Sequence, residues 1–363
     1  MPDIIHIIEP TLSNEAGHCL SLVNTIAQAS PDVHIILWAN RSAAFTFASG
    51  NVTIKKYFFR RIRKIQCLFL YKKLLKTQQK ILVSTASRLD LSTFSLAAKS
   101  LFSENKISKN RVYFYFHWLN ISAKKQKKLK EIARNQPNLV IFGTTPTALE
   151  SFKDIGFIHT HIVPYPLCAS AIATTPQPFS NVLYAGAARQ DKGFTQVVNL
   201  VEYVAKKKLN MPFLIQCSAE HFSKYDIATK ADVTRLKKIS HPYLEICTET
   251  LDAQQYTGHF AGAISIQLYN TKNFADRVSG VTLDALAAGS PILTLANTWM
   301  AKQVQQFDAG RVLNLTTPEA IVEALNEMIA NYAIYSKNAR TAGHALQQAH
   351  QAGQLTQLLL ANP

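Results

Sequence analysis

The chain has 363 residues, a length typical of two domains of ordinary size. Apolar residues make up 47% and charged residues 17%, so the chain can bury a large core, which excludes a disordered protein. No apolar run reaches the roughly 18 residues that span a bilayer. The first ten residues carry two acids and no basic cluster, which argues against a secretory signal, and the five scattered cysteines fit neither a disulfide framework nor a zinc site. We therefore expect a cytoplasmic protein.

The positive charge is concentrated in the first half of the chain. Before residue 170 there are 23 Lys and Arg against 9 Asp and Glu, a net charge of +14, whereas the remainder has 16 against 14, a net of +2. A field of this strength favours a polyanionic partner, either a nucleic acid or an anionic membrane surface.

Short apolar runs alternate with longer helical patterns along the first half. The runs are rich in Ile, Val, Leu and Phe and do not alternate with polar residues, which is typical of strands covered on both faces. The expected strands are 3–9, 33–40, 52–59, 81–87, 111–117, 139–145 and 161–167, with helical patterns between them that include 89–102 and 122–134. Alternation of this kind predicts right-handed crossovers and a parallel, doubly wound sheet.

The second half repeats the pattern. The expected strands are 181–187, 213–219, 244–249, 261–270, 291–297 and 311–315. The final stretch, 317–360, is helical throughout, with expected breaks near Gly343 and Gly353. Residues 168–180 are rich in small residues and prolines, as in a linker.

We therefore predict an α/β protein with two Rossmann-like, doubly wound parallel-sheet domains that face each other across a cleft. The first domain is expected over 1–170 and the second over 171–340, followed by a C-terminal helix, 341–363, that could return to the first domain. Ligands of open parallel sheets bind outside the carboxyl ends of the strands, so the cleft is the expected site.

Several familiar signatures are absent from the sequence. It has no G-x-x-x-x-G-K-[ST] phosphate loop, no G-x-G-x-x-G after the first strand, no G-x-S-x-G elbow and no Asp-x-Asp pair. His159 and His161 could in principle hold a metal, but no cysteine or carboxylate lies at ligand spacing, which favours a structural role at a strand edge. We expect neither a metal nor a bound cofactor.

Two loops could bind an anion. Gly17 lies near the start of a helical run, where free backbone N–H groups and the helix dipole favour negative charge, although an ordinary strand–helix turn explains it equally well. Arg189 and Lys192 follow the strand 181–187, and two cations there would stabilise a diphosphate leaving group. A solvated basic turn is the alternative for this second loop.

The most informative segment is 276–294. Asp276 and Asp284 lie on either side of a turn, Ser279-Gly280, that opens a helix, and Gly289-Ser-Pro closes that helix before the next strand. Asp276 is expected in the loop that faces the cleft, and Asp284 could accept hydrogen bonds from vicinal hydroxyls. Two ordinary surface acids would give the same pair, so the whole phrase carries more weight than the pair.

The two domains, the glycine after the first strand, the "G…KG" loop and the acid–seven–acid phrase that ends "ALAAGSP" together resemble the family 4 retaining glycosyltransferases of the GT-B fold, as a divergent bacterial-type member. The resemblance covers most of the chain, with its specific motifs in 181–295. It implies that the amide of Gly17 and the side chain of Lys192 bind the donor diphosphate. It also implies that Asp276 contacts the donor sugar and that Asp284 holds the nucleotide ribose.

The sequence departs from the family pattern at three places. Both glutamates of the acidic phrase are aspartates, which are shorter by one methylene. The arginine that normally follows the loop glycine is Ala187, and Arg189 could take its place at the diphosphate. The common "E-G-F-G" is replaced by 276–280, where Ser279 and Gly280 are still expected beside the diphosphate.

A cleft histidine at the end of a first-domain strand is usual in the family. His117 closes the strand 111–117 and is the natural candidate for a catalytic role beside Asp276. A lone histidine at a strand end is also often structural.

The segment 55–80 carries ten basic residues and no acid. At 100° per residue Phe58, Ile62, Ile65 and Phe69 share one face, with cations opposite, which is the pattern of an amphipathic segment on an anionic interface. A second basic run, 124–130, strengthens the field. A packed helix with a solvated basic face would show the same pattern.

The leading hypothesis is a metal-independent, retaining glycosyltransferase. Its donor would be a nucleotide-diphosphate sugar, and its acceptor a hydroxyl of a lipid-linked glycan, a glycolipid or a polysaccharide precursor at the inner face of the cytoplasmic membrane. The alternative is a non-catalytic GT-B-like protein that binds nucleic acid or a membrane through its basic first domain. We do not expect nucleic acid as a partner under the leading hypothesis. A sugar-nucleotide epimerase would need acid–base carboxylates in the cleft that the sequence does not place.

Overall fold

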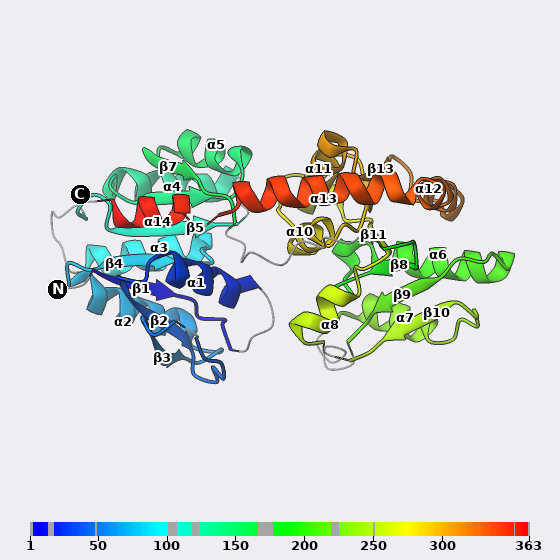
Figure 1. The fold of residues 1–363 in the computed structure, drawn as a ribbon. Coiled ribbons are helices and arrows are strands. Elements are labelled where there is room, and N and C mark those ends of the chain that lie inside the picture. Colours follow the sequence, from blue (N-terminus) through cyan, green and yellow to red (C-terminus); the bar gives the residue numbers. More distant parts are fainter. Residues whose placement is uncertain are drawn as a thin grey trace. The chain divides into compact units, whose positions relative to one another are not determined.

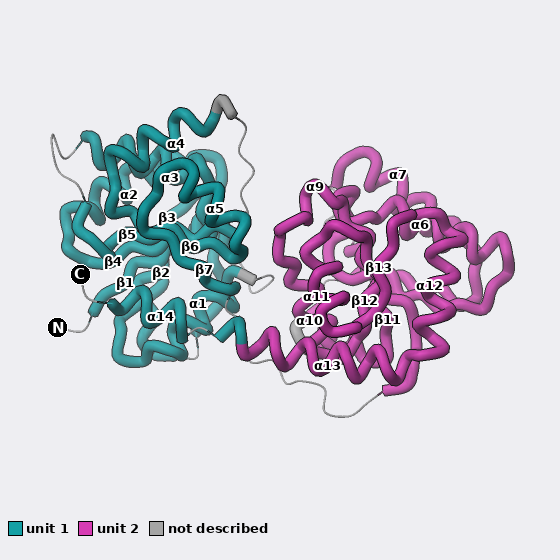
Figure 2. Tube along the Cα trace, turned by 90° about the horizontal axis from the view of Figure 1, so that it is seen from above, with its two compact units in different colours: residues 1–169, 349–363 teal, residues 170–348 magenta. Residues whose placement is uncertain are grey.

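The computed structural model describes residues 3–13, 18–47, 49–100, 107–117, 123–165, 177–218, 225–249, 251–351 and 353–361. The chain divides into two compact units, shown in different colours in Figure 2. Unit 1 comprises residues 1–169 and 349–363, and unit 2 comprises residues 170–348. Each unit is built around its own parallel sheet.

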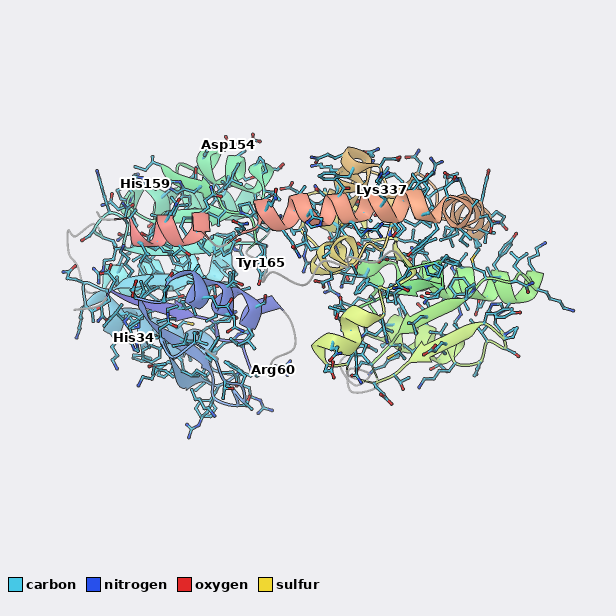
Figure 3. All side chains as sticks on the ribbon, viewed as in Figure 1. His34, Arg60, Asp154, His159, Tyr165 and Lys337 are labelled. Carbon is cyan, nitrogen blue, oxygen red and sulfur yellow. The ribbon has the colours of Figure 1, made fainter. Side chains whose placement is uncertain are left out.

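The sheet of unit 1 has seven strands, all parallel. They are β1 (Ile4–Ile8), β2 (His34–Asn40), β3 (Val52–Phe58), β4 (Lys80–Val83), β5 (Val112–Phe116), β6 (Val140–Gly143) and β7 (His159–Ile162). Their order is β3-β2-β1-β4-β5-β6-β7, so the strand order reverses between β1 and β4. β7, which carries His159 and His161, is an edge strand, and His159 is labelled in Figure 3.

Helices cover both faces of this sheet (Figure 1). They are α1 (His18–Ala29), α2 (Arg63–Leu75), α3 (Arg88–Lys99), α4 (Ala123–Asn135), α5 (Pro146–Ile155) and α14 (Gly353–Leu360). Alternate side chains of a strand point to opposite faces. On β5, Phe114 and Phe116 therefore pack toward α2 to α5, whereas Tyr113 and Tyr115 pack toward α1 and α14.

The sheet of unit 2 has six parallel strands in the order β10-β9-β8-β11-β12-β13. They are β8 (Asn181–Tyr184), β9 (Phe213–Gln216), β10 (Leu244–Cys247), β11 (Ala263–Gln267), β12 (Ile292–Leu295) and β13 (Gly310–Leu313). The strand order here reverses between β8 and β11.

Two helical layers cover this second sheet. One contains α6 (Phe194–Lys207), α7 (Ile227–Leu236) and α12 (Pro318–Ala330). The other contains α8 (Ala253–Gly258), α10 (Gly280–Ala287), α11 (Trp299–Phe307) and α13 (Tyr332–Ala349). A short turn of helix, η1 (Gln190–Lys192), follows β8, and α9 (Thr271–Phe274) follows β11.

The prediction of two doubly wound, Rossmann-like parallel sheets is confirmed. Each expected strand segment overlaps a strand, although β4 and β13 begin one residue and β7 two residues before the expected start. The expected linker, 168–180, lies largely outside the described residues.

The expected helix break near Gly343 is wrong. Gly343 lies in the middle of α13; the breaks in the final helical stretch fall at Asn331 and after Ala349, where α13 ends before α14 begins at Gly353. A Cβ added to Gly343 would lie 2.5 Å from the carbonyl oxygen of Leu286. The glycine therefore permits close packing of α13 against α10 and does not end the helix.

Candidate functional site

The reversal of strand order in unit 2 separates the loop after β8 from the loop after β11. In open parallel sheets such a switch point forms a crevice where ligands bind. The two loops meet at their bases, because the amide of Asn270 donates to the carbonyl oxygen of Asp191 at 2.9 Å. The sequence-predicted residues Arg189 and Lys192 belong to the first of these loops.

Two glycines shape the loop after β8. Gly193 has a φ of +74°, and a Cβ there would lie 2.2 Å from the carbonyl oxygen of Leu268, so only glycine fits against the end of β11. At Gly186, also at positive φ, a Cβ would lie 3.3 Å from the Nζ atom of Lys192. The "G…KG" spacing therefore makes room for the lysine side chain.

Lys192 lies at the centre of the candidate site. Its Nζ atom lies 5.4 Å from the centre of the Tyr269 ring, at the end of β11. Burial, together with the positive charges of Arg189 and Arg277, lowers the pKa of Lys192 to about 8, against the opposing effect of Asp191 and Asp284. A bound anion would favour the charged form of this lysine.

Arg189 is held by an acid of its own loop. Its Nε atom donates to Oδ1 of Asp191 at 2.8 Å, and its Nη2 atom donates to the second carboxylate oxygen. This two-point ion pair offsets the charge of Arg189 and fixes the geometry of the loop.

Asp284 faces the same strand ends from the second turn of α10. The hydroxyl of Tyr256, on α8, donates to Oδ2 of Asp284 at 3.2 Å. Burial raises the pKa of Asp284 to about 6, against the opposing effects of the Tyr256 hydrogen bond and of Lys192. At neutral pH most of this carboxylate is ionised and can accept hydrogen bonds from hydroxyl groups.

The remaining residues of the acidic phrase lie at the start of α10. Asp276 is in the loop between α9 and α10, with its Oδ1 atom 3.9 Å from Nζ of Lys302. Ser279 is the N-cap of α10 and accepts a hydrogen bond from the amide of Thr282. Gly280 is exposed at the first position of the helix, with open space where a Cβ would stand. This helix end can receive negative charge.

Sequence reasoning missed three residues of this site. Tyr256 lies 28 positions before its partner Asp284, and no local pattern links the two. Tyr269 is the second residue after β11, the strand beside the switch point, so the sheet topology could have identified it. Arg277 lies within residues 276–280, which the sequence analysis treats only as a replacement of the family's "E-G-F-G".

His117 belongs to unit 1, at the end of β5. Its Nε2 atom donates to the carbonyl oxygen of Ser84 at 2.7 Å, which fixes the ring and its tautomer. The ring contacts both Tyr115 and Tyr165, with centroid distances of 4.7 and 5.0 Å (Tyr165 is labelled in Figure 3). The predicted catalytic role of His117 stays a prediction.

The switch point of unit 1 is closed by an acid. Glu9 directly follows β1 and is fully buried. Its Oε2 atom accepts hydrogen bonds from Ser84, at 2.9 Å, and from Thr85, both just after β4. Its Oε1 atom accepts one from the hydroxyl of Thr11 at 2.6 Å. Gly17 lies outside the described residues, so its expected contact with a diphosphate stays a prediction.

The amphipathic segment of unit 1 differs from the prediction in two respects: Phe58 does not belong to the apolar face, and the side of α2 opposite that face is buried and apolar where cations were expected. Because β3 continues to Phe58 and α2 begins only at Arg63, Phe58 is a buried strand residue and does not share a helical face with the others. Ile62, Ile65 and Phe69 are 47%, 59% and 60% exposed. Cys67, Leu70, Tyr71 and Leu74 form the opposite, buried side of the helix.

Cations surround these exposed apolar side chains. We call the whole region the α2 surface; its apolar members are Phe59, Ile62, Ile65 and Phe69, and its exposed cations are Arg60, Arg61, Lys64, Lys73 and Lys76. Arg60, in the turn before α2, is labelled in Figure 3. Arg41 stacks over the Phe59 ring at 4.7 Å.

Among the described residues, no group of three or more His, Cys, Asp or Glu side chains could hold a metal ion. The helices within the described ranges include none that is long and apolar enough to cross a membrane.

No family model matches the chain, and no curated protein matches it in sequence. Its fold, however, is that of solved GT-B structures. A glycosyltransferase from Rickettsia africae ESF-5 superposes with a TM-score of 0.69 at 13% identity, and 99% of each chain is covered. Anabaena Alr3699/HepE, solved in complex with UDP-glucose, gives a TM-score of 0.68 at 11% identity, with 98% of each chain covered.

WaaG, a glycosyltransferase involved in lipopolysaccharide biosynthesis, gives a TM-score of 0.65 at 10% identity, with 99% of this chain and 100% of WaaG covered. At these identities the similarity establishes the GT-B fold of two Rossmann-like units.

Proposed function

We propose that this protein is a glycosyltransferase that transfers a sugar from a nucleoside-diphosphate donor. The observation that carries the proposal is the group of cations around Lys192 at the switch point of unit 2. A partly buried lysine whose pKa is lowered by two arginines is suited to an anionic ligand, and perturbed pKa values of this kind are characteristic of functional sites. HepE, which shares the fold, binds UDP-glucose.

Each residue of the site has a role in this proposal. Lys192, with Arg189 and the amides at Ser279 and Gly280, would hold the diphosphate and stabilise the charge that develops as the glycosidic bond breaks. Asp284, oriented by Tyr256, would accept hydrogen bonds from the ribose hydroxyls.

The proposed reaction retains the configuration of the sugar and needs no metal, since the cations of the site would take the place of a divalent ion at the diphosphate. Asp276 would contact the donor sugar, and His117 would act at the reacting centre from unit 1. The proton of the acceptor hydroxyl would pass to an oxygen of the departing diphosphate.

The proposed acceptor is a hydroxyl of a lipid-linked glycan, a glycolipid or a polysaccharide precursor. Support comes from the α2 surface, where projecting apolar side chains are ringed by cations, and from the net charge of +14 in the first half of the chain. Each such charge contributes about 1 kcal/mol to binding an anionic membrane. WaaG, of the same fold, acts in lipopolysaccharide biosynthesis. We propose that the protein docks peripherally on the inner face of the cytoplasmic membrane.

A thermal-shift panel tests the donor. The full chain is heated with UDP, GDP, ADP, CMP and TDP and with their common sugar conjugates, each with and without EDTA. Ligand binding raises the apparent stability by mass action. We expect one nucleoside diphosphate to stabilise the protein equally with and without EDTA. No stabilisation by any nucleotide would contradict the proposal and favour a non-catalytic binding protein.

Vesicle sedimentation tests the membrane. We expect binding to phosphatidylglycerol vesicles but not to phosphatidylcholine vesicles, and loss of binding in the double variant Ile65→Ser/Phe69→Ser. The matched control, Ile227→Ser/Ile334→Ser, removes two exposed apolar side chains from unit 2 and should bind like the wild type. Equal binding by all three proteins would rule out the α2 surface as the docking site.

A further inference from the structure

Arg277 and Lys192 each lie over one ring of a pair of touching aromatic side chains. The guanidinium carbon of Arg277 lies 5.0 Å from the centre of the Phe274 ring, and Nζ of Lys192 lies 5.4 Å from the centre of the Tyr269 ring. The two rings are themselves in contact, with centroids 4.7 Å apart. Each ring face therefore carries one cation, which is a favourable arrangement for both.

The charges of this region oppose one another. Burial and the charge of Arg189 lower the pKa of Arg277, and Arg189 and Arg277 both lower the pKa of Lys192. Three cations at one set of strand ends repel each other. Such an arrangement is favourable when a ligand supplies negative charge.

Both arginines are anchored by residues of their own segments. Arg189 donates from Nε and Nη2 to the carboxylate of Asp191, within its own loop. The guanidinium carbon of Arg277 lies over the ring of Phe274. A guanidinium presents a planar fork of N–H donors, and this fork matches the oxygens of a phosphate.

We propose that Arg277 is a phosphate-binding residue of this site and that, together with Lys192, it holds the diphosphate of the donor. The inference rests on the proposed donor class, because a nucleoside diphosphate supplies the two phosphates. Arg277 stands within the segment that replaces the family's "E-G-F-G", so this chain has a side-chain cation in that segment.

Inorganic pyrophosphate tests the inference independently of the nucleotide base. Wild type, Arg277→Ala, Arg277→Lys, Lys192→Ala and the control Lys272→Ala are titrated calorimetrically at about 0.15 M salt, which weakens binding to exposed charges elsewhere. Lys272 is an exposed cation on α9, the helix that ends at Phe274. Pyrophosphate binding that is present in the wild type and absent in Lys192→Ala is binding at the candidate site.

For that event we expect Arg277→Ala to weaken pyrophosphate binding roughly 10- to 100-fold, the usual cost of one charge-assisted hydrogen-bonding partner. Arg277→Lys should be intermediate, since it keeps the charge and loses the planar fork. Lys272→Ala should bind within about twofold of the wild type, as expected for an exposed charge. Wild-type affinity in Arg277→Ala would overturn the inference, as would the absence of a pyrophosphate event that depends on Lys192.

The pH dependence separates binding from a structural role. Lys192 faces the charges of Arg189, Arg277, Asp191 and Asp284. In the wild type the affinity for pyrophosphate should fall as the pH rises through about 8, the pKa of Lys192. Arg277→Ala removes one repelling charge, so the fall should move to higher pH. An unchanged pH profile would contradict the proposed proximity of the two cations.

Failure of this inference and failure of the proposed function give different results. If a nucleoside diphosphate stabilises the wild type while Arg277→Ala binds pyrophosphate normally, the proposed donor class is supported and the proposed role of Arg277 is refuted. If pyrophosphate binding depends on Arg277 but no nucleotide stabilises the chain, the phosphate site stands and the transferase does not.

Discussion

The two sheets of this protein share one strand order around their switch points but differ in the chemistry found there. In unit 1, the end of β1 carries Glu9, a fully buried acid that accepts hydrogen bonds from Ser84 and Thr85 at the end of β4. In unit 2, the corresponding strand ends carry Lys192 after β8 and Tyr269 after β11, with two arginines near the lysine.

The difference shows that topology provides a crevice and side chains decide what it can hold. The hydrogen bonds of Glu9 tie β1 to β4, so we interpret this acid as structural. The cations of unit 2 repel one another, and a bound anion would reduce this repulsion. We therefore propose that the cations at the switch point of unit 2 bind the ligand and that Glu9 serves the stability of unit 1, and the following predictions test that division.

Lys192→Ala should have the largest effect on activity. Removing one preorganised group that stabilises the departing diphosphate should lower the transfer rate about 100- to 1000-fold. The melting temperature should not fall, because burial and like charges disfavour this cation in the free protein. The assay is sugar transfer or slow donor hydrolysis, with Lys272→Ala as the control. Wild-type turnover in Lys192→Ala would refute the assignment of the diphosphate.

Glu9→Ala should show the opposite pattern. It leaves the buried hydroxyl of Ser84 without its carboxylate partner and opens a cavity, so the free energy of unfolding should fall by about 2–4 kcal/mol. Its affinity for nucleotide should change far less than that of Lys192→Ala. Denaturant titration measures the stability, and nucleotide titration of the folded variant measures the affinity. A large loss of nucleotide affinity at full stability would break the proposed division.

Asp284→Asn should stabilise the protein and weaken its binding of nucleotide. Burial raises the pKa of Asp284 to about 6 in the folded protein, above its ordinary value in the unfolded chain. Ionising this acid therefore costs more free energy in the folded state than in the unfolded state. The ionised acid therefore lowers stability at pH 7, and the penalty disappears as the pH falls through 6 toward 4. We expect Asn to raise stability at pH 7 by roughly 1–3 kcal/mol while weakening nucleotide binding.

Melting curves between pH 4 and pH 8 measure this effect. The advantage of Asp284→Asn should shrink as the pH falls, because the wild-type acid then becomes neutral. An advantage that is independent of pH would show that the charge of Asp284 is not its cause.

The pH dependence of nucleotide binding is the smallest predicted effect. The pKa of Lys192 is lowered to about 8, and only its charged form attracts a diphosphate. Between pH 7 and pH 9 the charged fraction falls about tenfold, so the affinity should fall by a similar factor. Glu9→Ala should follow the same curve, whereas Lys192→Ala should show no such fall.

Most of the fold could be predicted from the sequence because the strands of a covered parallel sheet are continuous apolar runs, as in Tyr113–Phe116. Local patterns failed where packing decides the outcome. Gly343 does not break its helix, because a glycine is also what lets α13 approach the backbone of Leu286. The helical face that began at Phe58 was wrong because the strand β3 includes that residue.

The site was predicted only in part, for a similar reason. Lys192 and Asp284 lie in motifs that a sequence displays, and the structure brings both to the same strand ends. Arg277 and Tyr256 interact with residues of other segments: the charge of Arg277 lowers the pKa of Lys192, and the hydroxyl of Tyr256 donates a hydrogen bond to Asp284. Contacts of this kind depend on how loops fold over the ends of strands, which no local spacing encodes.

A crystal structure of the protein with the nucleoside diphosphate that stabilises it most would test the central claim directly. The account predicts diphosphate density at the switch point of unit 2, with an oxygen within hydrogen-bond distance of Nζ of Lys192. A nucleotide whose diphosphate lies away from Lys192, for example on the exposed cations of the α2 surface, would contradict it.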